Sequence, residues 1–341
     1  MSQLPSRPDL EQARRQAKEL LRTARTGDGE AAARIAAVSD RQSLAGAQLA
    51  LAREHGFASW LQLKREIERR EILDDRDVDR LAALLAEEPG LATTPMIRWR
   101  DHRGGPSPLG YTAMLRYDTA AGVWRDLPGT GTVARVLLEA GALVDGNPGD
   151  AETPLITAAS YGDVEVARAL IEAGADIEAR AADDAGGVPG GTALLHAAVF
   201  GMTGVVDVLV ASGAQVKGIE EAAAAGDIGA WLLEAPADAR LRALVMAADH
   251  QRLDVIDQLI DAGTPVDATD PTFGGHPLRT AAWNGRAASV RRLLAHGADA
   301  SLADDEGRTP LDLCRLGDTR GHREVEAILT AHERMAGENV D

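Results

Sequence analysis

The chain has 341 residues, of which 45% are hydrophobic and 26% are charged, and its formal net charge is −17. Residues 1–70 carry 13 basic and 9 acidic side chains, whereas residues 71–341 carry 23 and 44, and such an acidic region repels nucleic-acid phosphates. The sequence has no apolar run near 18 residues and begins with polar residues, so we expect a cytoplasmic protein without a membrane span.

Residues 1–70 predict a small helical module. Pro8-Asp9-Leu10 is expected to start a basic helix that continues through Arg25, and Gly27-Asp28-Gly29 ends it. Three shorter helices are expected at about 30–38, 42–55 and 58–70. Because the ends of a stacked repeat array need to be covered, we interpret this module as a cap on the array that follows.

A repeated phrase dominates the sequence after the module. Its clearest copy reads Thr153-Pro154-Leu155-Ile156-Thr157-Ala158-Ala159. Related copies begin at Thr192, His276 and Thr309, and Pro277 and Pro310 are 33 residues apart. Thr before Pro can begin a helix, and glycines after the alanine pair end it, so each copy predicts two short helices. A fixed period of this length is typical of a solenoid.

The phrase resembles the ankyrin repeat. The resemblance implies an all-α solenoid of helix-turn-helix units with short hairpin loops, which binds partners on an extended concave face. We expect seven to eight units within residues 71–332, an insertion at 93–132 and a flexible tail at 333–341. The segment from Arg53 to Trp60 resembles an N-terminal helical module that many bacterial ankyrin proteins carry.

Aromatic residues are few, so their positions are informative. The chain has eleven, and in ankyrin units the two residues after the alanine pair point toward the concave face. Tyr161, Phe200 and Trp283 occupy this position in three units, and Asp249 with His250 occupies it in another. The alternative is that each ring packs on the next hairpin. A row across neighbouring units favours a binding surface.

The insertion is rich in aromatic and arginine side chains. Long irregular segments in a compact array are usually functional or disordered, and this content argues against disorder. A shorter insertion at 270–275 contains Phe273. We expect the insertions to converge on the concave face and form a pocket. Its predicted walls are Trp99, Tyr111, Trp124, Tyr161, Phe200, Phe273 and Trp283. Its predicted polar contacts are Asp101, Arg125, Asp126, Glu152, Asp249 and His250.

Three functions remain open from the sequence. An acidic, aromatic pocket suits a planar or cationic small molecule, and the ordinary alternative for such repeats is a partner protein. The third is an enzyme with Asp249 and His250 as an acid–base pair, although adjacent helical residues point in different directions. His196 is expected to bond neighbouring backbone. The histidines lack the spacing of zinc ligands, and Gly129-Thr130-Gly131-Thr132 lacks a following Gly-Lys, so we expect no metal and no cofactor. Because a capped solenoid is usually monomeric, we expect a monomer.

Overall fold

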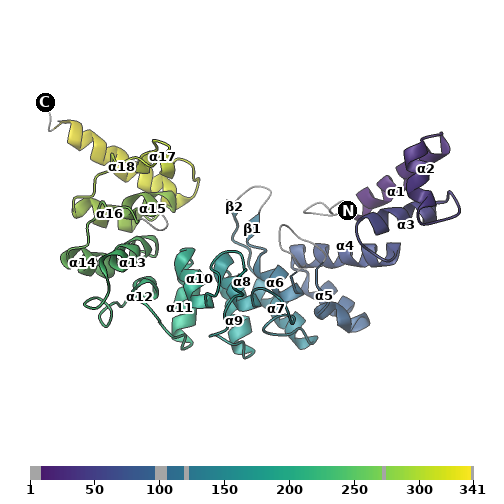
Figure 1. Ribbon diagram of the computed structural model, residues 1–341, viewed down its shortest axis with the longest axis horizontal. Coiled ribbons are helices and arrows are strands. Elements are labelled where there is room, and N and C mark those ends of the chain that lie inside the picture. Colours follow the sequence, from purple (N-terminus) through teal and green to yellow (C-terminus); the bar gives the residue numbers. More distant parts are fainter. Residues whose placement is uncertain (1–8, 97–105, 119–122, 271–273, 339–341) are drawn as a thin grey trace. The chain divides into compact units, whose positions relative to one another are not determined.

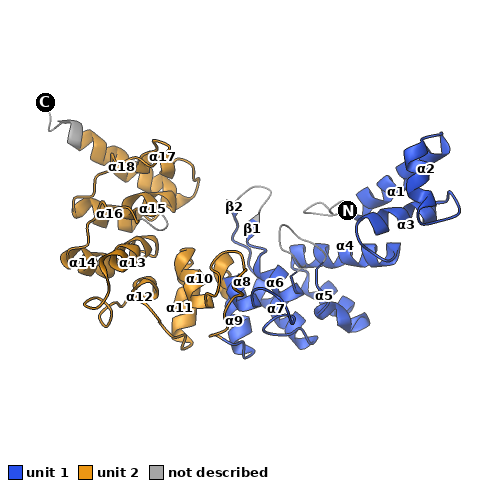
Figure 2. Cartoon of the chain, in the orientation of Figure 1, with its two compact units in different colours: residues 1–158, 165–176 blue, residues 159–164, 177–341 orange. Residues whose placement is uncertain are grey.

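The computed structural model describes residues 9–96, 106–118, 123–270 and 274–338 (Figure 1). Their regular secondary structure is helical apart from one antiparallel pair of two-residue strands and an isolated bridge between Arg180 and Thr192, which confirms the predicted all-α fold class. No helix in the described ranges is long and apolar enough to cross a membrane. The chain divides into two compact units, blue and orange in Figure 2, and each is described separately. Unit 1 comprises residues 1–158 and 165–176, and unit 2 comprises residues 159–164 and 177–341.

Unit 1 begins with the four helices that the sequence predicted for the N-terminal module. They are α1 (Leu10–Arg25), α2 (Gly29–Ala36), α3 (Leu44–Glu54) and α4 (Trp60–Asp75). A short polar side chain accepts a hydrogen bond from the first turn of each helix, as Asp9 does for α1 and Ser43 for α3. The last helix continues beyond residue 70, and Arg76 ends it with a φ of 55°.

The rest of unit 1 contains the first repeat-like helix pairs. Its elements are α5 (Val78–Glu87), the 3-10 helix η1 (Pro89–Ala92), α6 (Pro108–Ala113), β1 (Tyr117–Asp118), β2 (Val123–Trp124) and α7 (Thr130–Glu139). α5 contacts both α4 and α7, and α6 pairs with α7. The next pair is α8 (Pro154–Tyr161) and α9 (Val164–Glu172), and the boundary between the units passes through it.

The glycine-rich start of α7 receives a carboxylate from the same unit. Glu165 Oε2 accepts hydrogen bonds from the backbone N–H groups of Gly129, at 2.9 Å, and Gly131, at 3.2 Å. A Cβ on Gly131 would come within 2.8 Å of the Glu165 carbonyl oxygen, so this close approach requires glycine. The two amides that resemble a phosphate loop therefore already bind an anionic group of the chain.

Unit 2 stacks five helices, which we call the first helices, in chain order. They are α10 (Ala193–Val199), α12 (Ile219–Ala225), α13 (Ala237–Asp249), α15 (Pro277–Trp283) and α17 (Pro310–Cys314). Each contacts the next one along the chain. The second helices are α11 (Thr203–Ala211), α14 (Leu253–Asp261), α16 (Ala287–Ala295) and α18 (Arg320–Glu338). Buried leucine, isoleucine, valine and alanine side chains between the two rows form the core of this unit.

The unit that contains α12 has lost its second helix. Residues 226–236 form turns and irregular chain there. Arg252, at the start of α14, links the neighbours of this gap, because its Nε donates to the Ala224 carbonyl at 2.7 Å and its guanidinium pairs with Asp207 of α11. Trp231 packs partly on the core, whereas Leu233 is 93% exposed.

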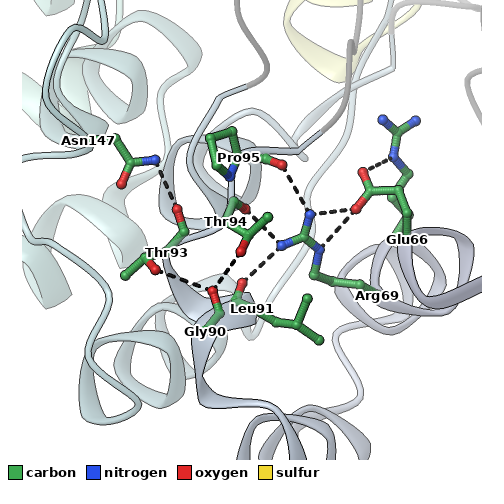
Figure 3. A network of polar contacts seen from close by, with 9 residues as sticks. Glu66, Arg69, Gly90, Leu91, Thr93, Thr94, Pro95 and Asn147 are labelled. Carbon is green, nitrogen blue, oxygen red and sulfur yellow. Dashed lines mark hydrogen bonds and ion pairs between the residues drawn. The ribbon is translucent and has the colours of Figure 1, made fainter. Parts of the chain in front are cut away.

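A buried arginine joins the N-terminal module to residues 91–95, which lie in and directly after η1 (Figure 3). Arg69 of α4 is 2% exposed. Its Nη1 donates to the carbonyls of Leu91 and Thr94, at 2.9 and 2.8 Å, and its Nη2 donates to that of Pro95 at 3.3 Å. Glu66, which is also buried, pairs with Arg69 and with the adjacent Arg70. The Arg69 guanidinium is thus paired and hydrogen-bonded where water is excluded.

Replacing this arginine should destabilise unit 1 strongly. We expect Arg69→Met to lower the free energy of unfolding by about 3–5 kcal/mol, because it leaves the carbonyl groups of residues 91–95 without their donor and Glu66 with only one of its two arginine partners. Urea unfolding followed by circular dichroism measures this change. Arg65→Met is the matched control, since Arg65 forms only partly exposed pairs on the same helix, and it should cost less than about 1 kcal/mol. Equal losses in the two variants would contradict a structural role for the buried network.

Candidate binding surface

The candidate surface lies where the first helices of unit 2 end. Exposed apolar side chains stand there, and we call them the helix-end row: Val199, Phe200, Trp283 and Leu316. They follow or end α10, α15 and α17. Counted from the glycine after each helix, Val199 corresponds to Trp283, and Phe200 corresponds to Leu316. Their exposed fractions range from 39% for Phe200 to 63% for Leu316. Phe200 and Trp283, which the sequence placed on the concave face, are therefore open to solvent, and their part in binding stays a prediction.

A glycine after α10 allows the neighbouring repeat to come close. Gly201 has a φ of 69°, and a Cβ at this position would lie 2.3 Å from Oδ2 of Asp249. No other side chain fits without moving the carboxylate. The end of α13 therefore approaches the turn after α10 at van der Waals distance, which fixes the backbone beside Phe200.

Asp249 is the centre of a polar network between these turns. Its Oδ1 accepts hydrogen bonds from Nδ2 of Asn284, at 2.9 Å, and Nε of Arg286, at 3.0 Å. The same guanidinium donates through Nη2 to the Gly201 carbonyl at 2.9 Å. The predicted ligand contact Asp249 is thus 7% exposed and is bound to groups of its own unit.

His250 is also held inside unit 2. Its Nε2 lies 2.8 Å from the Ala198 carbonyl and its Nδ1 lies 3.0 Å from Oγ1 of Thr203. Burial lowers the pKa of His250, so the ring is neutral near pH 7, with Nε2–H as donor and Nδ1 as acceptor. Both nitrogens are engaged, which is the arrangement of a structural histidine.

His196 repeats this arrangement in the preceding copy. Its Nε2 lies 2.9 Å from the Val188 carbonyl, and its Nδ1 lies 2.8 Å from Oγ of Ser160. The predicted bond from His196 to neighbouring backbone is confirmed. The ring centroid of Phe200 is 6.1 Å from that of His196, so one side of this exposed aromatic rests on a fixed imidazole.

The aromatic residues predicted in unit 1 have two different environments. Tyr111 is 1% exposed on α6, and its hydroxyl donates to Oδ1 of Asp74 at 2.6 Å. Burial raises the pKa of Tyr111, and the neighbouring carboxylate raises it further. Tyr111 therefore lies in the interior rather than on an open wall. Trp124 of β2 is exposed, and its ring lies 4.8 Å from that of Tyr117 across the hairpin.

The polar residues beside Trp124 are exposed. The Arg125 backbone N–H donates to the carbonyl of Arg116 at 2.7 Å, which extends the hairpin. The carboxylate of Asp126 lies 3.3 Å from Nη2 of Arg116. In water such a pair stabilises by less than about 1 kcal/mol, so Asp126 stays accessible to a ligand.

Glu152 is a predicted site residue whose carboxyl group has a strongly raised pKa. It precedes α8 in unit 1 and is partly buried. Burial raises the pKa of Glu152 to about 7. A carboxyl group in this state changes charge near neutral pH, and a cationic group beside it would favour the ionised form.

The remaining predicted residues divide as follows. Trp99, Asp101 and Phe273 lie outside the described residues. Tyr161 ends α8 within unit 2 and is partly buried. The predicted pocket therefore draws its described residues from unit 1 (Tyr111, Trp124, Arg125, Asp126 and Glu152) and from unit 2 (Tyr161, Phe200, Asp249, His250 and Trp283).

Two residues that shape the surface were not predicted. Arg286 and Asn284 hold Asp249, but each lies more than thirty residues away from it in the sequence. Asn284 stands at the position that Phe200 occupies in its own copy, but the sequence does not indicate its partner. Arg286 has no sequence signal, because its role depends on the backbone of Gly201, which follows α10 and lies three first helices before α15.

Comparison with known proteins identifies the repeats. A family model described as ankyrin repeats (3 copies) matches residues 129–219, and one described as ankyrin repeats (many copies) matches residues 259–314. The chain therefore contains ankyrin repeats in both segments. The human ASB11 ankyrin repeat domain, a crystal structure, aligns with 76% of this chain and 95% of its own at 20% identity, with a TM-score of 0.36.

Several curated proteins share short segments with the chain. Human Espin-like protein is 36% identical over 75 residues, which are 22% of this chain and 7% of that protein. The Drosophila melanogaster E3 ubiquitin-protein ligase Ufd4 is 39% identical over 77 residues, which are 23% of this chain and 3% of that protein. The Arabidopsis thaliana putative E3 ubiquitin-protein ligase XBAT35 is 34% identical over 91 residues, which are 26% of this chain and 19% of that protein. The chain thus matches less than a fifth of each relative's length.

The raised pKa of Glu152 predicts a pH-dependent stability. The folded state holds its proton up to about pH 7, whereas the unfolded chain releases it near 4.5, so folding becomes less favourable as the pH rises between these values. Glu152→Gln removes this charge. The variant should match the wild type at pH 4.5 and exceed it by about 1–3 kcal/mol at pH 8 in urea unfolding. Glu139→Gln, at an exposed position of the same unit, is the control. If Glu152→Gln raised the free energy of unfolding equally at pH 4.5 and pH 8, the result would contradict a raised pKa for Glu152 in the folded state.

Proposed function

We propose that this chain, which contains ankyrin repeats at residues 129–219 and 259–314, binds a partner protein through the helix-end row of unit 2. The observation that carries the proposal is the exposure of apolar side chains at the ends of first helices in three repeat copies, among them Phe200 and Trp283. Ankyrin repeats generally mediate protein–protein binding, and this row gives the proposed contact a definite place.

The composition of the row supports a protein partner. Single exposed apolar residues are common on soluble proteins, but a recurring set that includes aromatic rings is typical of interaction sites. Tryptophan often contributes a large share of binding energy, because it removes much apolar area from water with few rotatable bonds. Trp283 is the aromatic residue of the row with the larger exposed fraction.

The network beneath the row supports the same proposal. Asp249, Arg286 and Gly201 fix the turns that carry the row, and His250 bonds the end of α10. Side chains on fixed backbone lose little conformational freedom on binding, so more of the contact energy is retained as affinity. The ion pair is internal, and a partner would meet mainly apolar side chains there.

A planar or cationic small molecule is the second candidate, and unit 1 supplies its support. Trp124 presents an exposed ring, Asp126 an accessible carboxylate, and Glu152 a partly buried carboxyl group. A cation over an indole ring gains about 0.5–2 kcal/mol. The enzyme alternative has less support, because Asp249 and His250 are buried and hydrogen-bonded to groups of their own unit.

The proposal includes the N-terminal module as a cap. Support comes from the contact of α4 with α5 and from the bonds between buried Arg69 and residues 91–95. We further propose that the chain acts as a monomer in the cytoplasm. Size-exclusion chromatography with light scattering measures whether the chain is a monomer.

Site-specific photocrosslinking tests where the partner binds. We expect benzoylphenylalanine in place of Trp283 or Phe200 to crosslink one discrete protein in cells that natively make this chain, with identification by mass spectrometry. The same amino acid at Leu233 is the control, because this leucine is exposed outside the row. Equal crosslinking from all three positions would contradict the proposed surface.

The identified partner then permits an energetic test. Trp283→Ala should weaken its binding about thirtyfold in isothermal titration, which corresponds to about 2 kcal/mol, and should leave the melting temperature nearly unchanged. Leu233→Ala should change neither quantity. A large fall in melting temperature with unchanged affinity would make Trp283 a core residue and remove the central support of the proposal.

A further inference from the structure

The N-terminal module contains a groove that the proposed function does not use. It lies among α1, α2, α3 and α4 and has a volume of about 640 Å³. Its apolar lining consists of buried side chains from all four helices: Ala13, Leu20, Ala31, Leu51, Leu63 and Ile67. This volume lies within the range of small-molecule sites, about 300–1,000 Å³.

The amino-acid sequence explains why the groove is open. The apolar side chains of the module form two separate clusters, one around Ala17 and Phe57 and the other around Ile35 and Ala50. α1 contributes to both clusters, and the groove includes residues of each. Alanines at positions 13 and 31 leave space that larger side chains would fill.

The polar lining of the groove is distinctly acidic. It contains Asp9, Glu19, Asp28, Glu30 and Glu54, and its basic residues are Arg15 and Arg34. Five of the nine acidic residues of segment 1–70 thus line the groove, but only two of the thirteen basic ones do. The segment has a net charge of +4, so its negative charge is concentrated in this concavity.

Several of these carboxylates keep free acceptor capacity. Asp9 and Asp28 cap their helices through Oδ1, and the hydrogen bonds found for them involve only that oxygen. Glu54 is bound by Arg34 at 2.8 Å, and Glu19 is bound by Arg22 on the outer side of α1. A carboxylate accepts up to about four hydrogen bonds, so each can receive another donor.

We propose that this groove binds a linear polyamine, a chain of ammonium groups separated by short methylene segments. Asp9 and Glu19 lie about 15 Å apart along α1, at about 1.5 Å a residue, which places carboxylates near both ends of an extended polyamine. Ammonium groups pair with the carboxylates, while the methylene segments lie on the apolar lining as lysine stems do on protein surfaces.

The geometry favours a polyamine over a metal ion. The described residues contain no group of three or more His, Cys, Asp or Glu side chains placed to hold a metal ion. Spaced carboxylates around an apolar floor therefore match spaced organic cations.

The test uses the full chain and spermine as the probe in isothermal titration at 150 mM NaCl. We expect saturable binding of one spermine per chain. Glu19→Gln should weaken it at least threefold, and Glu11→Gln should not change it. These variants are matched, because both glutamates are exposed on α1 and each pairs with the arginine three residues later, but only Glu19 lines the groove.

A second pair of measurements separates the groove from general attraction to an acidic protein. Gln16→Trp fills the groove from an exposed position without changing charge, and it should abolish spermine binding while the circular dichroism spectrum is retained. MgCl2 at the same total cation charge should not give the saturable signal. Equal weakening by Glu11→Gln and Glu19→Gln, or full binding by a folded Gln16→Trp variant, would overturn the proposal. Neither result bears on the helix-end row, since the probe and the variants lie in the module.

Discussion

The close approach of neighbouring first helices is the constraint on which the candidate surface depends. Alanine pairs such as Ala197-Ala198 and Ala281-Ala282 are almost completely buried in unit 2, and their small side chains let the helix backbones come together. At this separation the imidazole of His250 reaches the Ala198 carbonyl, and Arg286 reaches that of Gly201. Larger residues at the alanine positions would separate the helices and break these bonds, because packed interiors have little free volume.

The sequence predicted the helices well because their ends carry local signals. Capping side chains such as Asp9 and Thr309 and the recurring Pro at the first helical position depend only on nearby backbone. The buried contacts of Arg69 had no comparable signal. Its carbonyl partners lie more than twenty residues away, and its position on α4 reads as an ordinary charged helix surface. A charged residue becomes a core residue only through tertiary partners.

The sequence predicted which side chains stand at the ends of the first helices, but it did not predict which of them are buried. The slot after each alanine pair identified Phe200 and Trp283, since the repeat fixes where that slot lies. The same reasoning predicted that Asp249 and His250 contact a ligand, whereas in the structure they form hydrogen bonds to neighbouring turns. Tyr111 was assigned to a pocket wall from residue type alone. An aromatic ring suits a core and a binding site equally, and its bond to Asp74 depends on α4.

The two surfaces of the chain would select their ligands by different physical means. In the helix-end row, Asp249 and Arg286 neutralise one another, so the exposed apolar side chains would carry most of the affinity through shape and area. Such contacts depend weakly on salt. In the module groove the unbalanced carboxylates would provide selection, and attraction between charges near water falls as ionic strength increases. The paired charges beneath the row would therefore make binding there depend little on ions, whereas the excess negative charge of the groove would favour cationic over neutral ligands.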